Sequence, residues 1–424
     1  MSYFLTAIQI NKIFHLENIH IPIDENEKKH LIITGKNGCG KTSLLLALKD
    51  FVNDAIYESH NSELQIDQDT PHKNIIPLKK ILRRHEFGLN LYEQNKAEKN
   101  EITEIRNKII GLTKQINDCY SHVKPIFNDI ITISEQAKKG DFVMAIYEAT
   151  RKTQMAAPKN PEKPQLKAFY NIQENKQEEF LKFLVDLKVQ EALARNENQI
   201  TYADEIKQWF IHFNDLLNQI FEGKSVHLSF NFKDYTFQIE QDGRRFGFNE
   251  LSDGYSAIID IVADLILKMQ TPGNITRAFQ KEGIVLIDEI ETHLHLELQK
   301  VILPFLTKVF PNIQFIVTTH SPFVLNSLPN AVAYDLEKQE SLTDLTDYSY
   351  EALAEGYFNV TLDSSFLQTK LNRYKNLLEI KERDTAQTHE LQQLDKELSQ
   401  LDDNLTPPHV KAAYLQLKLQ YPLK

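Results

Sequence analysis

The segment GKNGCGKT, residues 35 to 42, combines three glycines with a lysine and a threonine. It matches the phosphate-loop pattern G-x-x-x-x-G-K-[ST] and lies between the apolar run HLIITG and the helical run SLLLALKDF. The glycines Gly35, Gly38 and Gly40 allow backbone N–H groups to turn toward phosphate oxygens. We expect Lys41 to reach the β- and γ-phosphates and Thr42 to hold Mg²⁺. A chance match is the alternative, but the strand–loop–helix context makes it rare.

Asn37, Cys39 and Ser43 belong to the same predicted nucleotide-binding segment. Cys39 is open to two interpretations, a redox switch or a small residue that fills the loop. We favour the filler.

The segment GIVLIDEIE, residues 283 to 291, has the pattern of a buried strand that ends in two acids. Asp288 suits a magnesium ligand that acts through water, and Glu289 suits the base that activates an attacking water. A strand that ends in a charged turn is the alternative, and the upstream phosphate loop favours the catalytic interpretation. His293 and His295 follow closely, but two residues at this spacing on a helix face different directions, which argues against a metal site.

The segment IQFIVTTHSP, residues 313 to 322, predicts another buried strand, with His320 at its end. Ligands bind at the carboxyl ends of parallel strands, so His320 could contact the γ-phosphate or hold the attacking water. A structural histidine before a turn is the alternative.

The segment LSDGYS, residues 251 to 256, precedes a helix with one apolar face. Ser252 is a favourable N-cap residue, and Gly254 allows another backbone or a ligand to come close. A helix N-terminus also attracts anions. These residues are therefore either a cap or half of a phosphate site.

Composition restricts the class of protein. The chain has 424 residues, 42% of them hydrophobic and 25% charged, as in a soluble globular protein. The net charge of -11 disfavours a general nucleic-acid coat, so any DNA contact is expected to be local. We see no signal peptide and no apolar run long enough to span a membrane. Only Cys39 and Cys119 are present, which favours a reducing cytoplasm.

Strand and helix patterns divide the chain into four segments. Strands and the phosphate loop come first, and a largely helical region follows. In it, a short heptad seam at 102–116 and a second helical stretch at 166–195 could pair as an antiparallel hairpin. A predicted three-stranded meander over 226–251 then leads into the signature, acidic and histidine motifs. The expected boundaries are 1–55, 56–225 for a helical insertion, 226–363, and 364–424 for a helical tail that could dock a partner.

The order and spacing of these motifs resemble those of ABC-type ATPases. Within them the chain is most similar to the OLD, RecF and SMC-like branch, through NGCGKTSLL, DEIETHLHLELQ and TTHSPFV. The phrase YSYEALAEGYFNV further resembles the PtuA-type ATPase subunit of Septu and related anti-phage retron systems. The resemblance covers about two fifths of the chain.

The resemblance implies an α/β fold. Its ABC-type head has a mixed central sheet and an antiparallel β subdomain, is interrupted by a helical, short coiled-coil insertion, and is followed by C-terminal helices. It also implies that two copies share their ATP sites, with Ser252 and Gly254 contacting the γ-phosphate bound by the other copy. The sequence departs from the usual signature, because Asp253 replaces Gly or Ser and Tyr255 replaces Gln or Glu. The family's Q-loop glutamine has only Gln65 and Gln68 as candidates.

The implied function is a slow ATPase with ATP and Mg²⁺ as cofactors. It would act as a nucleotide-dependent switch in an anti-phage complex that controls a separate effector, such as an HNH nuclease, with or without a retron reverse transcriptase and its RNA or DNA. The expected protein is a cytoplasmic homodimer or higher homo-oligomer. One alternative is a RecF- or SMC-type DNA repair ATPase, supported by the basic segment KKILRRH at 79–85, although a solvated helix face also explains that cluster. Another is a nucleotide-sensing scaffold with little turnover.

Overall fold

The structure is a computed structural model. It describes residues 2–58, 69–94, 99–150, 155–221, 225–270, 279–342, 345, 352–353, 365–380, 382–401 and 408–421. By internal contacts the chain divides into two compact units, Met1–Tyr348 and Ser349–Lys424. The first unit contains all of the predicted nucleotide motifs.

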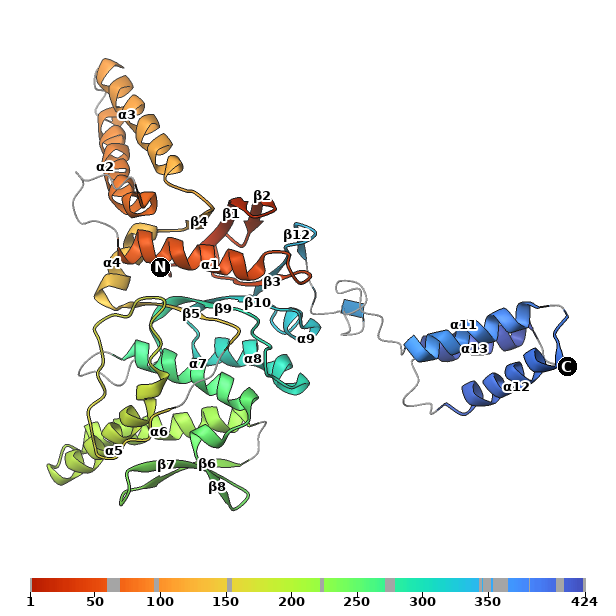
Figure 1. Ribbon diagram of the computed structural model, residues 1–424. Helices are drawn as coiled ribbons and strands as arrows, with labels where there is room; N and C mark the ends of the chain where they lie inside the picture. Colours follow the sequence, from red (N-terminus) through yellow and green to blue (C-terminus); the bar gives the residue numbers. More distant parts are fainter. Residues whose placement is uncertain are drawn as a thin grey trace. The chain divides into compact units, whose positions relative to one another are not determined.

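A mixed sheet forms the centre of the first unit (Figure 1). Its strand order is β12-β11-β3-β10-β9-β5 within the described residues. All neighbouring pairs are parallel except β11 with β12. The strands are β3 (His30–Thr34), β5 (Phe142–Tyr147), β9 (Glu282–Ile287), β10 (Ile313–Thr318), β11 (Ala331–Asp335) and β12 (Glu340–Leu342). The strands β3, β5 and β10 are buried at every position, as expected for a sheet covered on both faces.

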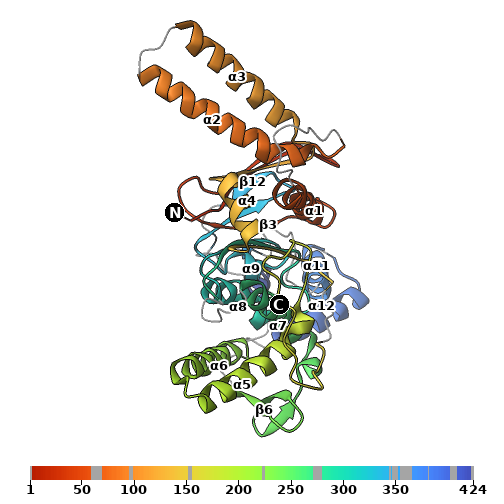
Figure 2. The same cartoon turned by 90° about the vertical axis from the view of Figure 1, so that its left-hand side faces the viewer.

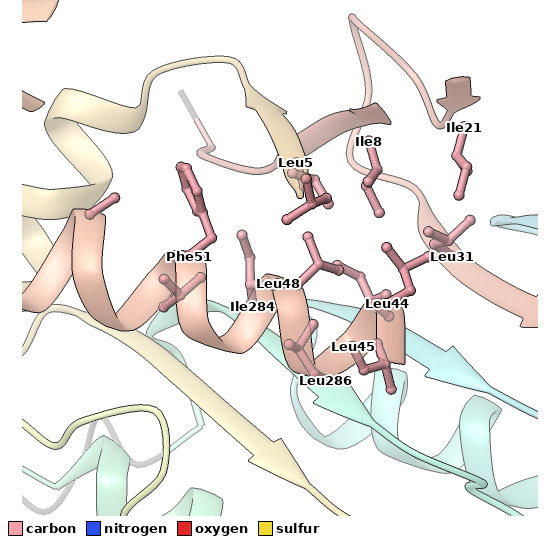
Figure 3. Close-up of a cluster of buried hydrophobic side chains, with 14 of the residues drawn as sticks. Leu5, Ile8, Ile21, Leu31, Leu44, Leu45, Leu48, Phe51, Ile284 and Leu286 are labelled. Atoms are coloured by element: carbon pink, nitrogen blue, oxygen red, sulfur yellow. The ribbon is translucent and has the colours of Figure 1, made fainter. Parts of the chain in front are cut away.

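A second, antiparallel sheet has the order β2-β1-β4. It comprises β1 (Leu5–Ile13), β2 (Leu16–Pro22) and β4 (Val123–Phe127). Helix α1 (Lys41–Val52) lies between this sheet and the central one, with Leu44, Leu48 and Phe51 in a shared apolar core (Figure 3). This sandwich fixes the direction of α1, and therefore of the loop that precedes it.

Helices cover both faces of the central sheet (Figures 1 and 2). Helix α4 (Ile130–Lys139) lies on the same side as α1, whereas α7 (Asp253–Met269) and α8 (Leu296–Val309) lie on the opposite side. Short helical segments complete the unit: the π turn Asn53–Tyr57, the 3₁₀ turns Pro71–Asn74, Gln177–Glu179 and Phe248–Glu250, and α9 (Pro322–Leu325). The architecture confirms the predicted α/β class with a mixed central sheet.

Two helix hairpins project from opposite ends of this unit (Figures 1 and 2). One is α2 (Ile75–Gln94) with α3 (Lys99–Asp118), and the other is α5 (Phe180–Asn196) with α6 (Ile200–Ile220). The predicted pairing of the 102–116 and 166–195 stretches is therefore wrong. Each helix packs against its neighbour in sequence, because a short loop is the least costly way to close an antiparallel pair.

The predicted helical insertion over 56–225 is also too simple. Strand β4 pairs with β1, and β5 pairs with β9, so residues 123–147 return to the sheets of the first unit. These two strands were hard to identify from sequence. The β4 segment VKPIF is short and contains Pro125, and the β5 segment FVMAIY is an apolar run without alternation. The predicted meander is confirmed as β6 (Val226–Asn231), β7 (Thr236–Gln241) and β8 (Arg244–Phe246), although β8 ends earlier than expected.

The second unit contains α11 (Ser365–Glu379), α12 (Thr385–Ser399) and α13 (Pro408–Gln420), which confirms the prediction of helices in the tail. Tyr374, Leu391 and Tyr414 belong to its buried cluster. The Asp395 carboxylate accepts hydrogen bonds from the hydroxyls of Tyr374 and Tyr414, at 2.8 and 2.7 Å. Among the described residues of the whole chain, no helix is both long and apolar enough to cross a membrane.

Candidate nucleotide-binding site

Three neighbouring parallel strands end at the same edge of the central sheet. Strand β3 leads into the phosphate loop, β9 into Asp288 and Glu289, and β10 into His320. The carboxyl edge of an open parallel sheet is where ligands bind in such folds. Segments that are far apart in sequence therefore meet where a nucleotide would be expected.

The phosphate loop has the backbone that its glycines permit. Gly35, Gly38 and Gly40 have φ values of 133°, 82° and 102°, in a region that residues with a Cβ rarely adopt. Two of them are also crowded. A Cβ on Gly35 would lie 2.8 Å from Cys39 Sγ, and a Cβ on Gly40 would lie 2.8 Å from Leu16 Cδ1. Any residue with a side chain would therefore distort the loop.

The Lys41 side chain forms hydrogen bonds with the backbone of its own loop. It is buried, and its Nζ donates to the carbonyls of Gly35 at 2.8 Å and Lys36 at 3.2 Å. Burial lowers the pKa of Lys41, while Cys39 and nearby carboxylates oppose that effect. The Cys39 thiol is itself buried, and burial raises its pKa, which disfavours the reactive thiolate. Among the other predicted loop residues, Asn37 is exposed and Ser43 is half-buried at the start of α1.

A hydrogen bond joins the phosphate loop to the end of β9. The Thr42 hydroxyl donates to Asp288 Oδ2 at 2.8 Å, although the two residues are 246 positions apart. The Thr318 hydroxyl, from the end of β10, donates to Asp288 Oδ1 at 2.6 Å. The backbone N–H of Asp288 donates to the Tyr147 carbonyl at 2.8 Å. Both oxygens and the backbone of Asp288 are thus fixed by three separate elements.

Glu289 begins a tight turn after β9. Its φ of 43° lies in the left-handed region, which costs a residue with a Cβ about 1 kcal/mol. The turn is held to β10, because Glu289 N donates to Thr318 Oγ1 at 2.8 Å and Ile290 N donates to the Thr318 carbonyl at 3.1 Å. The Glu289 carboxylate accepts from the Thr292 hydroxyl at 3.3 Å. Backbone strain of this kind is concentrated at functional sites.

His320 is half-buried in the loop after β10. Burial lowers the pKa of His320, and the Lys41 charge lowers it further, while Glu291, Glu289 and Asp288 oppose these effects. The imidazole is therefore neutral near pH 7 and lies within electrostatic reach of both the loop lysine and the acidic turn. His320 N donates to Glu291 Oε1 at 2.5 Å.

The segment LSDGYS lies at the start of α7. Ser252 occupies the N-cap position that its residue type favours, but its side chain is exposed and makes no cap hydrogen bond. Gly254 is buried, and a Cβ there would lie 2.8 Å from the His293 carbonyl oxygen. Tyr255 stacks on Phe221 with ring centroids 4.4 Å apart. Close packing therefore explains Gly254, while the Ser252 hydroxyl has no structural task in the cap.

Sequence reasoning missed two residues that organise this edge of the sheet. Thr318 binds both Asp288 and the Glu289 backbone, and Glu291 binds the loop that carries His320. The doubled threonine before His320 was a signal that could have been used, because hydroxyls at a strand end commonly bind the neighbouring turn. The Q-loop candidates Gln65 and Gln68 lie outside the described residues.

The basic segment at 79–85 lies on α2 and is partly engaged within the chain. Arg83 pairs with Asp129 at 2.8 Å, and Lys80 pairs with Glu135 at 2.8 Å. Burial also lowers the pKa of Lys79. These contacts hold the α2–α3 hairpin against the α4 region and account for part of the cluster without DNA.

The chain is similar to several known proteins. Residues 139–326 match the family model described as "AAA domain, putative AbiEii toxin, Type IV TA system". The Septu protein PtuA of Bacillus mycoides (strain KBAB4) is 36% identical over 162 residues, which cover 36% of this chain and 22% of that protein. The retron Vc95 probable ATPase of Vibrio cholerae serotype O1 biovar El Tor is 25% identical over 286 residues, covering 65% of this chain and 47% of that protein.

The matched segments thus span less than half of these two relatives. Among solved structures, an SMC head bound to the C-terminal winged-helix domain of ScpA aligns over 80% of this chain and 96% of that chain. Its TM-score is 0.38 and its identity is 12%.

Proposed function

We propose that this chain, which is related in sequence to the Septu PtuA and retron ATPases, binds ATP with Mg²⁺ and hydrolyses it. The observation that carries the proposal is the contact between Thr42 and Asp288, at 2.8 Å. It brings the hydroxyl of the phosphate-loop helix to the acid of the adjacent strand, which is the pair of groups that an ATPase of this type needs around its metal.

The phosphate loop supplies the binding energy for the nucleotide. Backbone N–H groups at the N-terminus of α1 favour an anion, and the buried Lys41 adds a positive charge. Lys41 now donates to two carbonyls of its own loop, so it would exchange these hydrogen bonds for the β- and γ-phosphates. The exchange replaces neutral acceptors by charged ones, which form stronger hydrogen bonds.

The donor set fits Mg²⁺. A hydroxyl and a carboxylate are the hard oxygen ligands that Mg²⁺ prefers, and both can be satisfied directly or through water. When bound, Mg²⁺ neutralises phosphate charge and orients the γ-phosphate for attack. Thr318 keeps Asp288 in place by binding its second carboxylate oxygen.

Glu289 and His320 are the proposed catalytic residues. Glu289 would accept a proton from the attacking water, and its left-handed backbone places it in the tight turn directly after β9. His320, neutral because burial and Lys41 lower its pKa, would donate a hydrogen bond to the γ-phosphate or hold the water. Together they would act only on the terminal phosphate, so they should affect hydrolysis more than binding.

We further propose that two copies share each ATP, with Ser252 and Gly254 of one chain facing the phosphate loop of the other. The exposed Ser252 side chain makes no cap hydrogen bond, so its hydroxyl can serve a ligand at the positive end of α7. Asp253 is exposed beside it, and its carboxylate would have to point away from the phosphate.

At the level of the cell, we propose that ATP binding and hydrolysis switch a separate effector in anti-phage defence; the similarity to a Septu protein and a retron ATPase supports this proposal. An HNH nuclease is the effector class that we expect. The second candidate, a DNA repair clamp, has less support, because ion pairs within the chain already engage Lys80 and Arg83.

Two variants test the proposal by separating binding from hydrolysis. Lys41→Ala should abolish ATP binding, and Glu289→Gln should keep ATP bound while slowing hydrolysis by about 10²- to 10⁴-fold. Equilibrium nucleotide titration and phosphate release measure the two quantities. Unchanged ATP affinity in Lys41→Ala would remove the phosphate-loop assignment, and wild-type turnover in Glu289→Gln would mean that another group activates water.

A further inference from the structure

One carboxylate joins the acidic turn after β9 to the loop that carries His320. Glu291 Oε2 accepts from the Thr319 hydroxyl at 2.7 Å, and Glu291 Oε1 accepts from the backbone N–H of His320 at 2.5 Å. Both oxygens are thus committed to two consecutive residues. A hydrogen bond to a charged acceptor is about twice as strong as a neutral one, so this contact is stronger than an ordinary loop hydrogen bond.

The Thr319 hydroxyl links Glu291 to Ser321, further along the loop. Its oxygen accepts from Ser321 N at 3.0 Å, and the Ser321 hydroxyl donates to Gln299 Oε1 at 2.7 Å. Gln299 in turn donates through Nε2 to the Leu294 carbonyl at 2.7 Å. The chain of contacts begins and ends in the segment 291–295, so the His320 loop is held against that segment from both sides.

The same segment touches the start of α7. The His293 carbonyl oxygen would lie only 2.8 Å from a Cβ at Gly254, so the two backbones are in close contact. The His295 ring meets Tyr255 edge-on, with centroids 6.1 Å apart. Segment 291–295 therefore lies between the loop of His320 and the start of α7, which follows Ser252.

We propose that Glu291 is a positioning residue for ATP hydrolysis, which holds His320 at the γ-phosphate by fixing its backbone to segment 291–295. The inference rests on the proposed function. Glu291 itself touches no nucleotide in this assignment, since both of its oxygens face the protein. Because segment 291–295 also supports Gly254, a shift of the His320 loop would be transmitted to the half-site offered to the second copy.

The effect of Glu291 should appear in turnover and not in binding. Glu291→Ala leaves the His320 N–H and the Thr319 hydroxyl without their acceptor. We expect kcat to fall by about 10- to 100-fold, by analogy with the loss of a group that orients a metal ligand. Glu291→Gln keeps one acceptor oxygen and should recover part of the loss. ADP affinity should remain as in the wild type. Glu297→Gln, in which an exposed acid of α8 is changed, is the matched control and should behave as the wild type.

A double-mutant cycle with His320→Ala provides the decisive measurement. If Glu291 acts through His320, the Glu291 variants should cost little further activity once His320 is absent. Wild-type kcat in Glu291→Gln and Glu291→Ala, or losses that multiply with that of His320→Ala, would overturn the inference.

Unfolding of a variant, or failure of the proposed function, would each give a distinct result. If Glu291→Ala does not fold, Glu291→Gln and Thr319→Val are judged by the same cycle. A wild-type chain that neither binds nor hydrolyses ATP would instead refute the proposed function, which separates the two failures.

Discussion

Around Asp288, single residues divide into those that would touch the nucleotide and those that hold them. Lys41, Thr42 and Glu289 belong to the first group. Thr318 and Glu291 belong to the second, because their side chains bind Asp288, the Glu289 backbone and the loop of His320. The holding residues are needed because a hydroxyl or carboxylate that must meet a phosphate has to be placed before the ligand arrives.

Buried His30 at the start of β3 gives a prediction on pH. Its Nδ1 accepts from Phe315 N at 3.0 Å, and burial lowers its pKa to about 4. Between pH 6.5 and 4 the unfolded chain takes up a proton that the folded chain does not. This residue's contribution to stability is therefore intact above pH 6.5 and is lost as the pH falls. We expect a loss of about 2 kcal/mol between pH 7 and pH 5 from this residue.

Urea unfolding at both pH values, in the wild type and in His30→Asn, measures this difference. The asparagine keeps an acceptor near the Nδ1 position but does not titrate. The free energy of unfolding that the variant loses between pH 7 and pH 5 should therefore be about 2 kcal/mol smaller than in the wild type. Equal losses in the two proteins would assign the acid sensitivity to other groups.

Among the elements, helix α7 carries charged residues on a buried side. Nearly all of its residues are buried, yet Asp260, Asp264 and Lys268 recur at four-residue spacing along one side. Asp264 pairs with Lys268 at 2.9 Å and accepts from the Tyr147 hydroxyl at 2.7 Å and from Lys176 N at 2.6 Å. Beside this cluster lies a polar cavity of about 340 Å³, lined in part by Tyr147 and Asp260. The polar side of α7 therefore fixes it to the end of β5.

Removing one partner of this buried pair should be costly. Asp264→Ala leaves the Lys268 charge uncompensated in a site where the two side chains are 1% and 0% exposed, and we expect a loss of about 3 to 5 kcal/mol. Tyr147→Phe removes a single hydrogen bond to a charged group and should cost about 1.5 to 3 kcal/mol. Denaturant unfolding measures both.

Two further variants act as controls for this prediction. Glu104→Ala, which breaks an exposed pair on α3, should leave unfolding unchanged. Replacing the pair by Asp264→Leu with Lys268→Met should recover much of the stability, because neither charge of the pair then remains buried. A mild effect of Asp264→Ala would show that water reaches Lys268.

At the scale of the whole molecule, the question is whether one chain contains a complete ATP site. The phosphate loop and the acidic turn lie together at one edge of the sheet, and Ser252 begins α7 on the other side of segment 291–295. If two copies share the ATP, Lys41→Ala and Ser252→Arg chains should each be inactive as homodimers. Their mixture should recover activity, because one composite site then has an intact loop from one chain and an intact Ser252 from the other.

For random mixing of equal amounts, about a quarter of wild-type activity is expected in a two-fold symmetric dimer. Phosphate release by the mixture is the measurement. Lys41→Ala mixed with Glu289→Gln is the matched control, because both changes affect the same half-site and neither composite site is then complete. An inactive first mixture, in heterodimers shown to form, would contradict sharing, and an active control would mean that Lys41 and Glu289 of one chain act on different ATP molecules.

The sequence alone determined the motifs and the elements that carry them. GKNGCGKT predicts its loop because only glycine readily adopts the backbone found at residues 35, 38 and 40, and because an apolar run precedes it and a helical run follows it. The strand before Asp288, the strand before His320 and the helix after LSDGYS were predictable for the same reason. Each depends on interactions within a few residues.

The tertiary structure alone decided how these elements meet. Nothing near Phe142–Tyr147 indicates that it would form an edge strand beside β9, since a short apolar run suits a helix or a strand equally well. Likewise, the contact of Thr42 with Asp288 depends on the order of strands in the sheet, which is set by packing between segments 246 residues apart. The roles of Thr318 and Glu291 follow from that order too, because a hydroxyl or carboxylate has no assigned partner until neighbouring strand ends are brought together.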